Sequence, residues 1–200
     1  MRTQPHRWLM AGAIWGPGLF IAAWVLAGLL APNYPPVEDH ISDLAAVDAP
    51  TRVLMSLGFA AFAIGAGSAA WPLRRLVGWP AALALGVNAA LTLGVMLTPV
   101  GGSPDIDVLH GGFAGLAYVS LAAVGPLASL TFRRRGLALP IASLAVGLIT
   151  LACLWASLGD TAPGLFQRLG LTATDVWLMT IGFAAVFGRR RADERAAVGQ

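Results

Sequence analysis

The chain has 200 residues, of which 57% are hydrophobic and only 12% are charged, and its mean hydropathy is +0.72. Soluble domains carry roughly 25% charged residues, so this composition excludes an ordinary soluble domain and indicates an integral membrane protein. The net charge of +3 comes from 13 arginines without any lysine. These arginines lie at the ends of apolar segments, which argues against a nucleic-acid partner and for membrane topology and contact with anionic lipid head groups.

Six apolar segments are predicted to be membrane-spanning helices. A helix crosses a bilayer core of about 30 Å with about 20 residues, and each segment comes close to that length. The runs are about twice as long as barrel strands and do not alternate, so helices are favoured over a barrel. We therefore expect an all-α fold, a single polytopic transmembrane domain over residues 1–200 with six helices. The predicted spans are 8–31, 52–73, 77–98, 108–132, 137–158 and 172–188.

The connections between these spans alternate in charge. Eleven of the 13 arginines precede the first span or follow the second, fourth and sixth spans, and only Arg52 and Arg168 lie on the other side. Loop arginines resist translocation and mark the cytoplasmic face. We therefore expect a multi-pass plasma-membrane protein with both termini in the cytoplasm and a cytoplasmic tail at 189–200. The short arginine connections and the three longer loops, each with prolines and acids, suggest three repeated helical hairpins.

Small and polar residues inside the spans predict how the helices pack. Two glycine pairs with four-residue spacing, Gly12 with Gly16 and Gly111 with Gly115, are expected to let neighbouring helices approach closely. Asn88 and Thr92, also four apart, are expected to form interhelical hydrogen bonds. No function is assigned to either pattern.

The acidic residues gather on the side opposite the arginines, together with two of the three histidines. Most of these residues are expected to be solvated loop charges. The outer acids are Glu38, Asp39, Asp43, Asp48, Asp105, Asp107, Asp160 and Asp175, and the outer histidines are His40 and His110.

Four positions on this side favour a binding site. Asp107 and His110 are three residues apart, so on a helix they share a face and are expected to point together into the bundle. Ser42 and Asp43 lie where the chain enters the second span. Ionisable groups at membrane depth are costly and usually serve a function, so we expect Asp43, Asp107 and His110 to line one polar pocket.

Arg168 completes the predicted ligand-binding set of Ser42, Asp43, Asp107, His110 and Arg168. It lies on the wrong side for a topology signal, so it is expected to be a structural or ligand-pairing cation. The candidate partners are Asp160, which is nearest in sequence, and Asp43 or Asp39.

Four short motifs resemble a known family. They are GPGLF at residues 16–20, PNY at 32–34, HISDL at 40–44 and GLFQR at 164–168. Together they resemble the DUF998 family of membrane proteins over most of the chain, although Asn33 stands where the family often has glycine. The resemblance implies a six-helix integral membrane protein and no settled activity.

A more distant likeness concerns membrane hydrolases of the alkaline ceramidase type, which Ser42, Asp43 and His110 resemble in part. That likeness implies a lipid hydrolase. For such an enzyme the catalytic candidates are Asp43, Asp107 and His110. A zinc ion would need about three protein ligands, with His40, His110 and Asp43 as candidates. The alternative without a metal is that Asp43 caps the second span and that His110 is hydrogen-bonded to Asp107.

Three functions therefore stay open. The first is a non-enzymatic protein that binds a lipid, a small amphiphile or a membrane partner through a polar pocket at the outer face. The second is a metal-dependent or acid/base lipid hydrolase at that face. The third is a small transporter, which the lack of charged or broken spans at the membrane midplane disfavours.

Overall fold

Six long helices and one short 3₁₀ helix make up the regular structure. The computed structural model describes residues 5–133 and 136–198, and no strand occurs among them. The six long helices are long and apolar enough to cross a membrane, which confirms the predicted all-α, six-span fold. The elements are α1 (Pro5–Leu30), η1 (Ile41–Ala45), α2 (Arg52–Val77), α3 (Trp79–Leu97), α4 (Pro104–Phe132), α5 (Ala138–Ser157) and α6 (Pro163–Val198).

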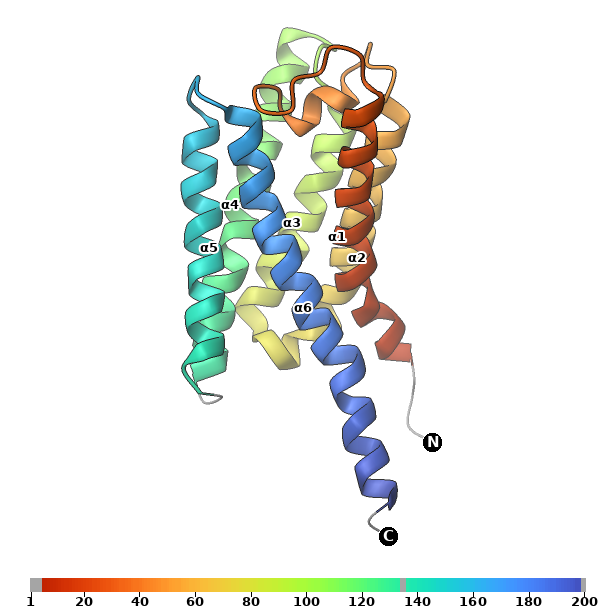
Figure 1. Ribbon diagram of the computed structural model, residues 1–200, viewed down its shortest axis with the longest axis vertical. Coiled ribbons are helices and arrows are strands. Elements are labelled where there is room, and N and C mark those ends of the chain that lie inside the picture. Colours follow the sequence, from red (N-terminus) through yellow and green to blue (C-terminus); the bar gives the residue numbers. More distant parts are fainter. Residues whose placement is uncertain (1–4, 134–135, 199–200) are drawn as a thin grey trace.

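The long helices form a closed ring. Each one packs against its neighbours in sequence, and α6 returns to contact α1. Figure 1 shows both termini at one end of the bundle and the longer loops, with η1, at the other end. The C-terminal part of α6 extends past the remaining helices at the end with the termini (Figure 1). We call the opposite end the loop end.

Two helices begin earlier than the hydropathy pattern predicts. The helix α6 starts at Pro163 instead of near residue 172, and α4 starts at Pro104 instead of near residue 108. Proline is tolerated in a first helical turn because its missing N–H would have no partner there, and Ser103 caps α4 by accepting from the backbone N–H of Ile106. The first turns of α6 contain Gln167 and Arg168, whose polarity hid this part of the helix.

The structure describes only some of the arginines, and only part of the C-terminal tail, on which the predicted membrane topology rests. The predicted tail at 189–200 is helical as far as Val198, and the last two residues lie outside the described residues, as do Arg2, Arg134 and Arg135. Arg7 lies near the N-terminus and donates to the Val186 carbonyl of α6 at 3.0 Å, which ties the two terminal helices together.

Glycines permit the closest helix contacts, although not at both predicted pairs. A methyl group placed on Gly16 would lie 3.0 Å from the Cα of Gly65 in α2, so the expectation for Gly12 and Gly16 is confirmed. The expectation for Gly111 and Gly115 is wrong, because a methyl group on either would meet no atom within 4 Å. These two glycines lie on a face of α4 that no described helix covers.

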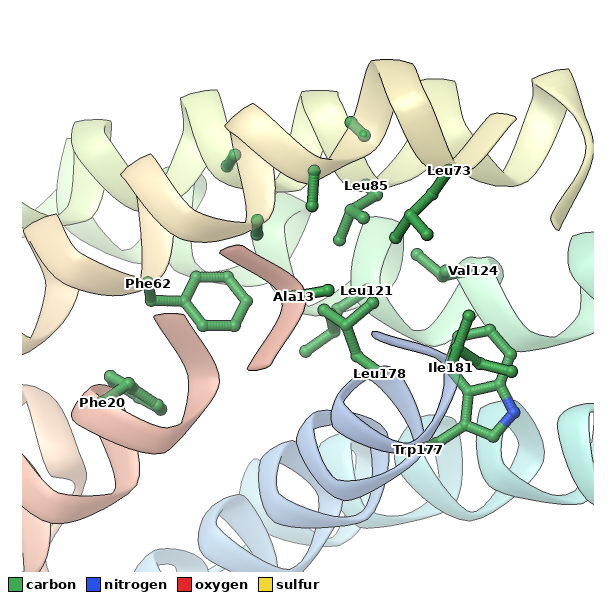
Figure 2. Close-up of a cluster of buried hydrophobic side chains, with 14 of the residues drawn as sticks. Ala13, Phe20, Phe62, Leu73, Leu85, Leu121, Val124, Trp177, Leu178 and Ile181 are labelled. Carbon is green, nitrogen blue, oxygen red and sulfur yellow. The ribbon is translucent and has the colours of Figure 1, made fainter. Parts of the chain in front are cut away.

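Apolar side chains fill the centre of the bundle. Phe20 of α1 and Phe62 of α2 lie near one another, as Figure 2 shows, and Leu121 and Leu178 lie further along the bundle. The ring centroids of Phe20 and Phe62 are 5.6 Å apart. Inside a membrane such contacts stabilise the bundle through close packing, since lipid tails are as apolar as the side chains.

Candidate functional site

A cavity of about 80 Å³ opens inside the ring of helices. It lies between α1, α2, α3, α4 and α6 and is bounded by η1, whereas α5 contributes no residue to it. Its lining combines aromatic and aliphatic side chains with a few polar ones, which is the usual composition of a ligand pocket. The lining residues are Phe20, Ile41, Ser42, Phe59, Phe62, Asn88, Thr92, Val95, His110, Ala114, Ala117, Tyr118, Leu121, Gln167, Leu171 and Asp175.

The cavity extends from the loop end deep into the bundle. Ser42 and Ile41 bound it from η1, between the first two spans, and His110 lies near the start of α4. Leu121 follows His110 by eleven residues, which corresponds to about 16 Å along a helix. The lining therefore extends over about this distance along α4, from His110 to Leu121.

His110 is buried, and its tautomer follows from its partner. Its Nδ1 lies 2.6 Å from the Thr98 carbonyl oxygen. Because a carbonyl can only accept, Nδ1 carries a proton and donates it to Thr98. The expected bond between His110 and Asp107 is thus replaced by one to the backbone at the end of α3.

Asp175 is the most deeply buried ionisable residue of the site. It is 1% exposed, and neither of its carboxylate oxygens has a hydrogen-bond partner among the described residues. It follows the start of α6 by twelve residues, which is about 18 Å along the helix. Its grouping with the outer acids is therefore wrong, as is the statement that the spans carry no charged residue near the midplane.

Asn88 leaves a second acceptor without a partner. Its Nδ2 donates to the Ala117 carbonyl of α4 at 2.7 Å, which confirms the predicted interhelical hydrogen bond. Thr92 instead donates within its own helix, to the Asn88 carbonyl. The Oδ1 atom of Asn88 is buried without a partner among the described residues, so Asn88 and Asp175 both present free acceptors in the cavity lining.

Aromatic side chains form much of the remaining wall. The ring centroid of Phe20 lies 5.6 Å from those of both Phe59 and Phe62. Tyr118 is buried on α4, and its hydroxyl donates to the Gln167 carbonyl at 3.2 Å. The wall is therefore apolar, except where Tyr118 crosses to α6.

Arg168 lies outside the cavity and is bound into the fold. It is 7% exposed, and its Nη1 donates to the carbonyls of Pro36, Asp39 and Gly164 at 2.7, 2.8 and 2.9 Å. Its Nη2 donates to the Tyr34 hydroxyl. Among the described residues none of these partners is a carboxylate, so the predicted pairing with Asp160, Asp43 or Asp39 is replaced by backbone carbonyls and a phenol.

The first loop is held against α6 by further polar contacts. Gln167 accepts from the backbone N–H of Ile41 at 2.7 Å, and Leu165 donates from its backbone to Val37 at 2.9 Å. A methyl group on Gly164 would overlap the Asp39 carbonyl. The GLFQR motif therefore docks the loop, and η1 with it, over the loop end of the cavity.

Asp43 and Tyr34 belong to this docked loop. Asp43 accepts from the backbone N–H of His40 at 2.8 Å and so caps η1, not the second span as the capping alternative expects. Burial raises the pKa of Asp43. Burial also raises the pKa of Tyr34 to about 12, against the opposing influence of Arg168.

The remaining predicted site residues do not converge. Asp107 is exposed and accepts from the backbone N–H of Gly101 at 2.8 Å, so the expectation that it points into the bundle with His110 is wrong. Of the predicted ligand-binding set, Ser42 and His110 line the cavity, and Asp43, Asp107 and Arg168 do not. The described residues contain no group of three or more His, Cys, Asp or Glu side chains that could hold a metal ion, so His40, His110 and Asp43 do not gather as zinc ligands.

Asp175 is the site residue that sequence reasoning missed. A signal was present, because it is the one carboxylate within the last apolar run, and a carboxylate inside a span is by default a candidate functional residue. The hydropathy pattern starts the last span near residue 172, which places Asp175 in its first turn beside the preceding loop, whereas α6 starts at Pro163.

Comparison with known proteins places the chain in a family. Among curated proteins and solved structures, no match to the chain is found. A family model described as "Protein of unknown function (DUF998)" matches residues 14–184. The chain is therefore a member of the DUF998 family of membrane proteins, as its motifs predict.

Proposed function

We propose that the protein binds a small amphiphilic molecule in the cavity between α1, α2, α3, α4 and α6. One observation carries the proposal: Asp175 lines the cavity fully buried, and its carboxylate has no partner among the described residues. Burying a polar group without a hydrogen bond costs roughly 2 kcal/mol or more. A ligand that completes these bonds accounts for a carboxylate at this depth.

The direction of entry follows from the charge pattern of the chain. The loop end carries the longer acidic loops, and the arginine connections lie at the end with the termini. The positive-inside rule therefore supports an orientation with cytoplasmic termini and a cavity that opens toward the outside of the plasma membrane. Membrane lipids are then the first partners to reach it.

Thiol protection tests the binding proposal. The single cysteine, Cys153, is first replaced by alanine. In this cysteine-free protein, Ala114→Cys then puts one thiol in the cavity lining. Labelling by N-ethylmaleimide is followed in detergent with and without octanol, octylamine or octanoate. We expect at least one of these eight-carbon amphiphiles to slow the labelling of the Ala114→Cys variant in a saturable manner.

Two matched variants control this measurement. Thr161→Cys puts the thiol in an exposed loop and should be labelled at a rate that no amphiphile changes. Ala122→Cys puts it on the same helix, buried but outside the cavity lining, and should react slowly throughout. If no amphiphile protects the Ala114→Cys variant, or if all three variants respond alike, the binding proposal is wrong.

A small transporter is the second candidate, and Asp175 favours it. An unpartnered carboxylate deep in a span is typical of substrate and proton pathways, and the lack of such a residue was the reason to disfavour transport. Uptake of radiolabelled octylamine into proteoliposomes, compared with the Asp175→Asn variant, tests this function. The hydrolase alternative has less support, because Asp43 and Asp107 hydrogen-bond to backbone groups outside the cavity.

A further inference from the structure

We propose that the inner part of the cavity recognises a protonated primary or secondary amine, through Asp175 and Asn88. This inference rests on the proposed function and specifies the chemical class of the ligand. It follows from which hydrogen-bonding groups of the lining are already used and which are left open.

Most side-chain donors of the lining are used, and the exceptions among the described residues, the Ser42 hydroxyl and the Gln167 amide, belong to η1 and to the first turns of α6. Asn88, Thr92, His110 and Tyr118 all direct an N–H or O–H group to a backbone carbonyl. The acceptors, in contrast, are open: both oxygens of Asp175 and Oδ1 of Asn88 have no partner among the described residues. A ligand group that fits beside Asp175 and Asn88 must therefore donate hydrogen bonds.

Charge narrows the choice among donors. An ionised carboxylate at this depth needs a compensating positive charge. An alcohol could donate to Asp175 but supplies no such charge, and an anion would be repelled by the ionised form. An alkylammonium group supplies both N–H donors and a positive charge, and charge-assisted hydrogen bonds are roughly twice as strong as neutral ones. Arg168, two turns away on α6, does not provide this charge, because its guanidinium is directed to the loop carbonyls.

The apolar wall agrees with the same ligand class. Phe20, Phe59 and Tyr118 contribute rings to the lining, and a cation within about 6 Å of a ring face is attracted by the ring quadrupole. A cavity of about 80 Å³ has room for an ammonium group with a few carbon atoms. A longer alkyl chain would have to extend toward the loop end or between the helices.

The thiol-protection assay with amphiphiles of matched chain length tests the ligand class. Octylamine is protonated at pH 7, octanol is neutral and octanoate is an anion. We expect octylamine to half-protect the Ala114→Cys variant at a concentration lower than that of octanol by about tenfold or more, as one charge-assisted bond would give. Octanoate should give no protection.

A second substitution assigns the preference to Asp175. Asp175→Asn keeps the side-chain volume and removes the charge, and it should abolish the advantage of octylamine over octanol. Asp48→Asn removes the same charge from an exposed loop position and should leave the advantage intact. This control separates recognition in the cavity from attraction of the amine to the acidic loop end.

The outcomes separate the two proposals. If no amphiphile protects, the binding function fails and the amine inference fails with it. If octanol or octanoate protects as well as octylamine, or if Asp175→Asn leaves the octylamine advantage unchanged, the cavity binds amphiphiles but the amine inference is wrong.

A charge-paired reagent covers the case in which Asp175→Asn does not fold. With Asp175 intact, the thiol of each single-cysteine variant is modified by the cationic 2-aminoethyl methanethiosulfonate and, separately, by the anionic 2-sulfonatoethyl methanethiosulfonate. The ratio of the first rate to the second measures the preference for a cation. The amine inference requires this ratio to be about tenfold higher for Ala114→Cys than for Thr161→Cys. Equal ratios at the two positions overturn it.

Discussion

Two buried ionisable residues on α6 differ in how the fold treats them. Arg168 and Asp175 are seven residues apart, which is about two helical turns, and both are almost fully buried. Arg168 donates to three backbone carbonyls and to Tyr34, with only Nε left unpaired among the described residues. Asp175 has no partner on either oxygen.

The difference has a physical cause in the position of each residue. The loop at residues 31–40 is irregular, so its carbonyls are free to accept from Arg168. Deeper in the bundle, the backbone N–H groups that could serve a carboxylate are already bonded within their helices. A buried cation beside a loop can therefore be a structural element, whereas a buried anion between regular helices needs a side chain, a proton or a ligand.

The largest effect is expected from removing the partnered member of the pair. Arg168→Ala leaves several buried carbonyls without a donor and should lower the free energy of unfolding by about 3 kcal/mol. Arg168→Lys should recover only part of this loss, because an ammonium group cannot donate as a planar fork. Thermal unfolding in detergent measures both variants, and an unchanged midpoint for Arg168→Ala would make Arg168 a solvated loop residue.

The next largest loss of stability is expected at Gly164, which lies against the Asp39 carbonyl to which Arg168 donates. In Gly164→Ala the new methyl group overlaps the Asp39 carbonyl, which should cost about 2 kcal/mol in unfolding free energy. Gly115→Ala is the matched control, since its methyl group meets no atom within 4 Å, and it should gain about 0.5 kcal/mol. Equal unfolding midpoints for the two variants would contradict the docked loop.

Substitution of Asp175, the residue without a hydrogen-bond partner, should not lower the free energy of unfolding. Asp175→Asn removes a buried carboxyl group whose oxygens have no hydrogen-bond partner among the described residues. The unfolding free energy should therefore stay the same or rise by about 1 kcal/mol, while the octylamine preference is lost. Asp43→Ala provides the contrast, because it removes a carboxylate that caps η1 and should cost about 1 kcal/mol. A large loss of stability in Asp175→Asn would mean that Asp175 has a structural partner.

At neutral pH no change is expected from the last group, Tyr34, which makes the stability of the loop depend on pH only in alkaline solution. Burial raises the pKa of Tyr34 from its ordinary value of 10.0 to about 12. Because the folded pKa exceeds the unfolded one, the contribution of Tyr34 to stability is complete below pH 10 and is lost as the pH rises through 12. The chain has two tyrosines, so Tyr118→Phe leaves Tyr34 as the only phenol. Its absorbance at 295 nm should then titrate near pH 12 in the folded protein, and a midpoint near 10 would indicate an exposed side chain.

Sequence alone determined the part of the fold that depends on hydrophobicity. Length and apolarity predict six spans, because every span must bury its backbone in hydrogen-bonded helix. The glycine contact of Gly12 and Gly16 and the interhelical bond of Asn88 also follow from local pattern. The depth of Ser42 and His110 was predictable for the same reason, since both stand next to apolar runs.

Tertiary structure alone decided which polar groups meet. Asp107 is exposed and His110 lines the cavity because of how α4 is rotated in the bundle. A spacing of three residues does not fix this rotation. The close approach of Gly125 to the Ser143 carbonyl of α5, and the open face at Gly111 and Gly115, likewise depend on which side of α4 its neighbours occupy. Hydropathy reports how apolar a segment is, whereas a cavity with Asp175 among its lining residues arises only when five helices are packed around it.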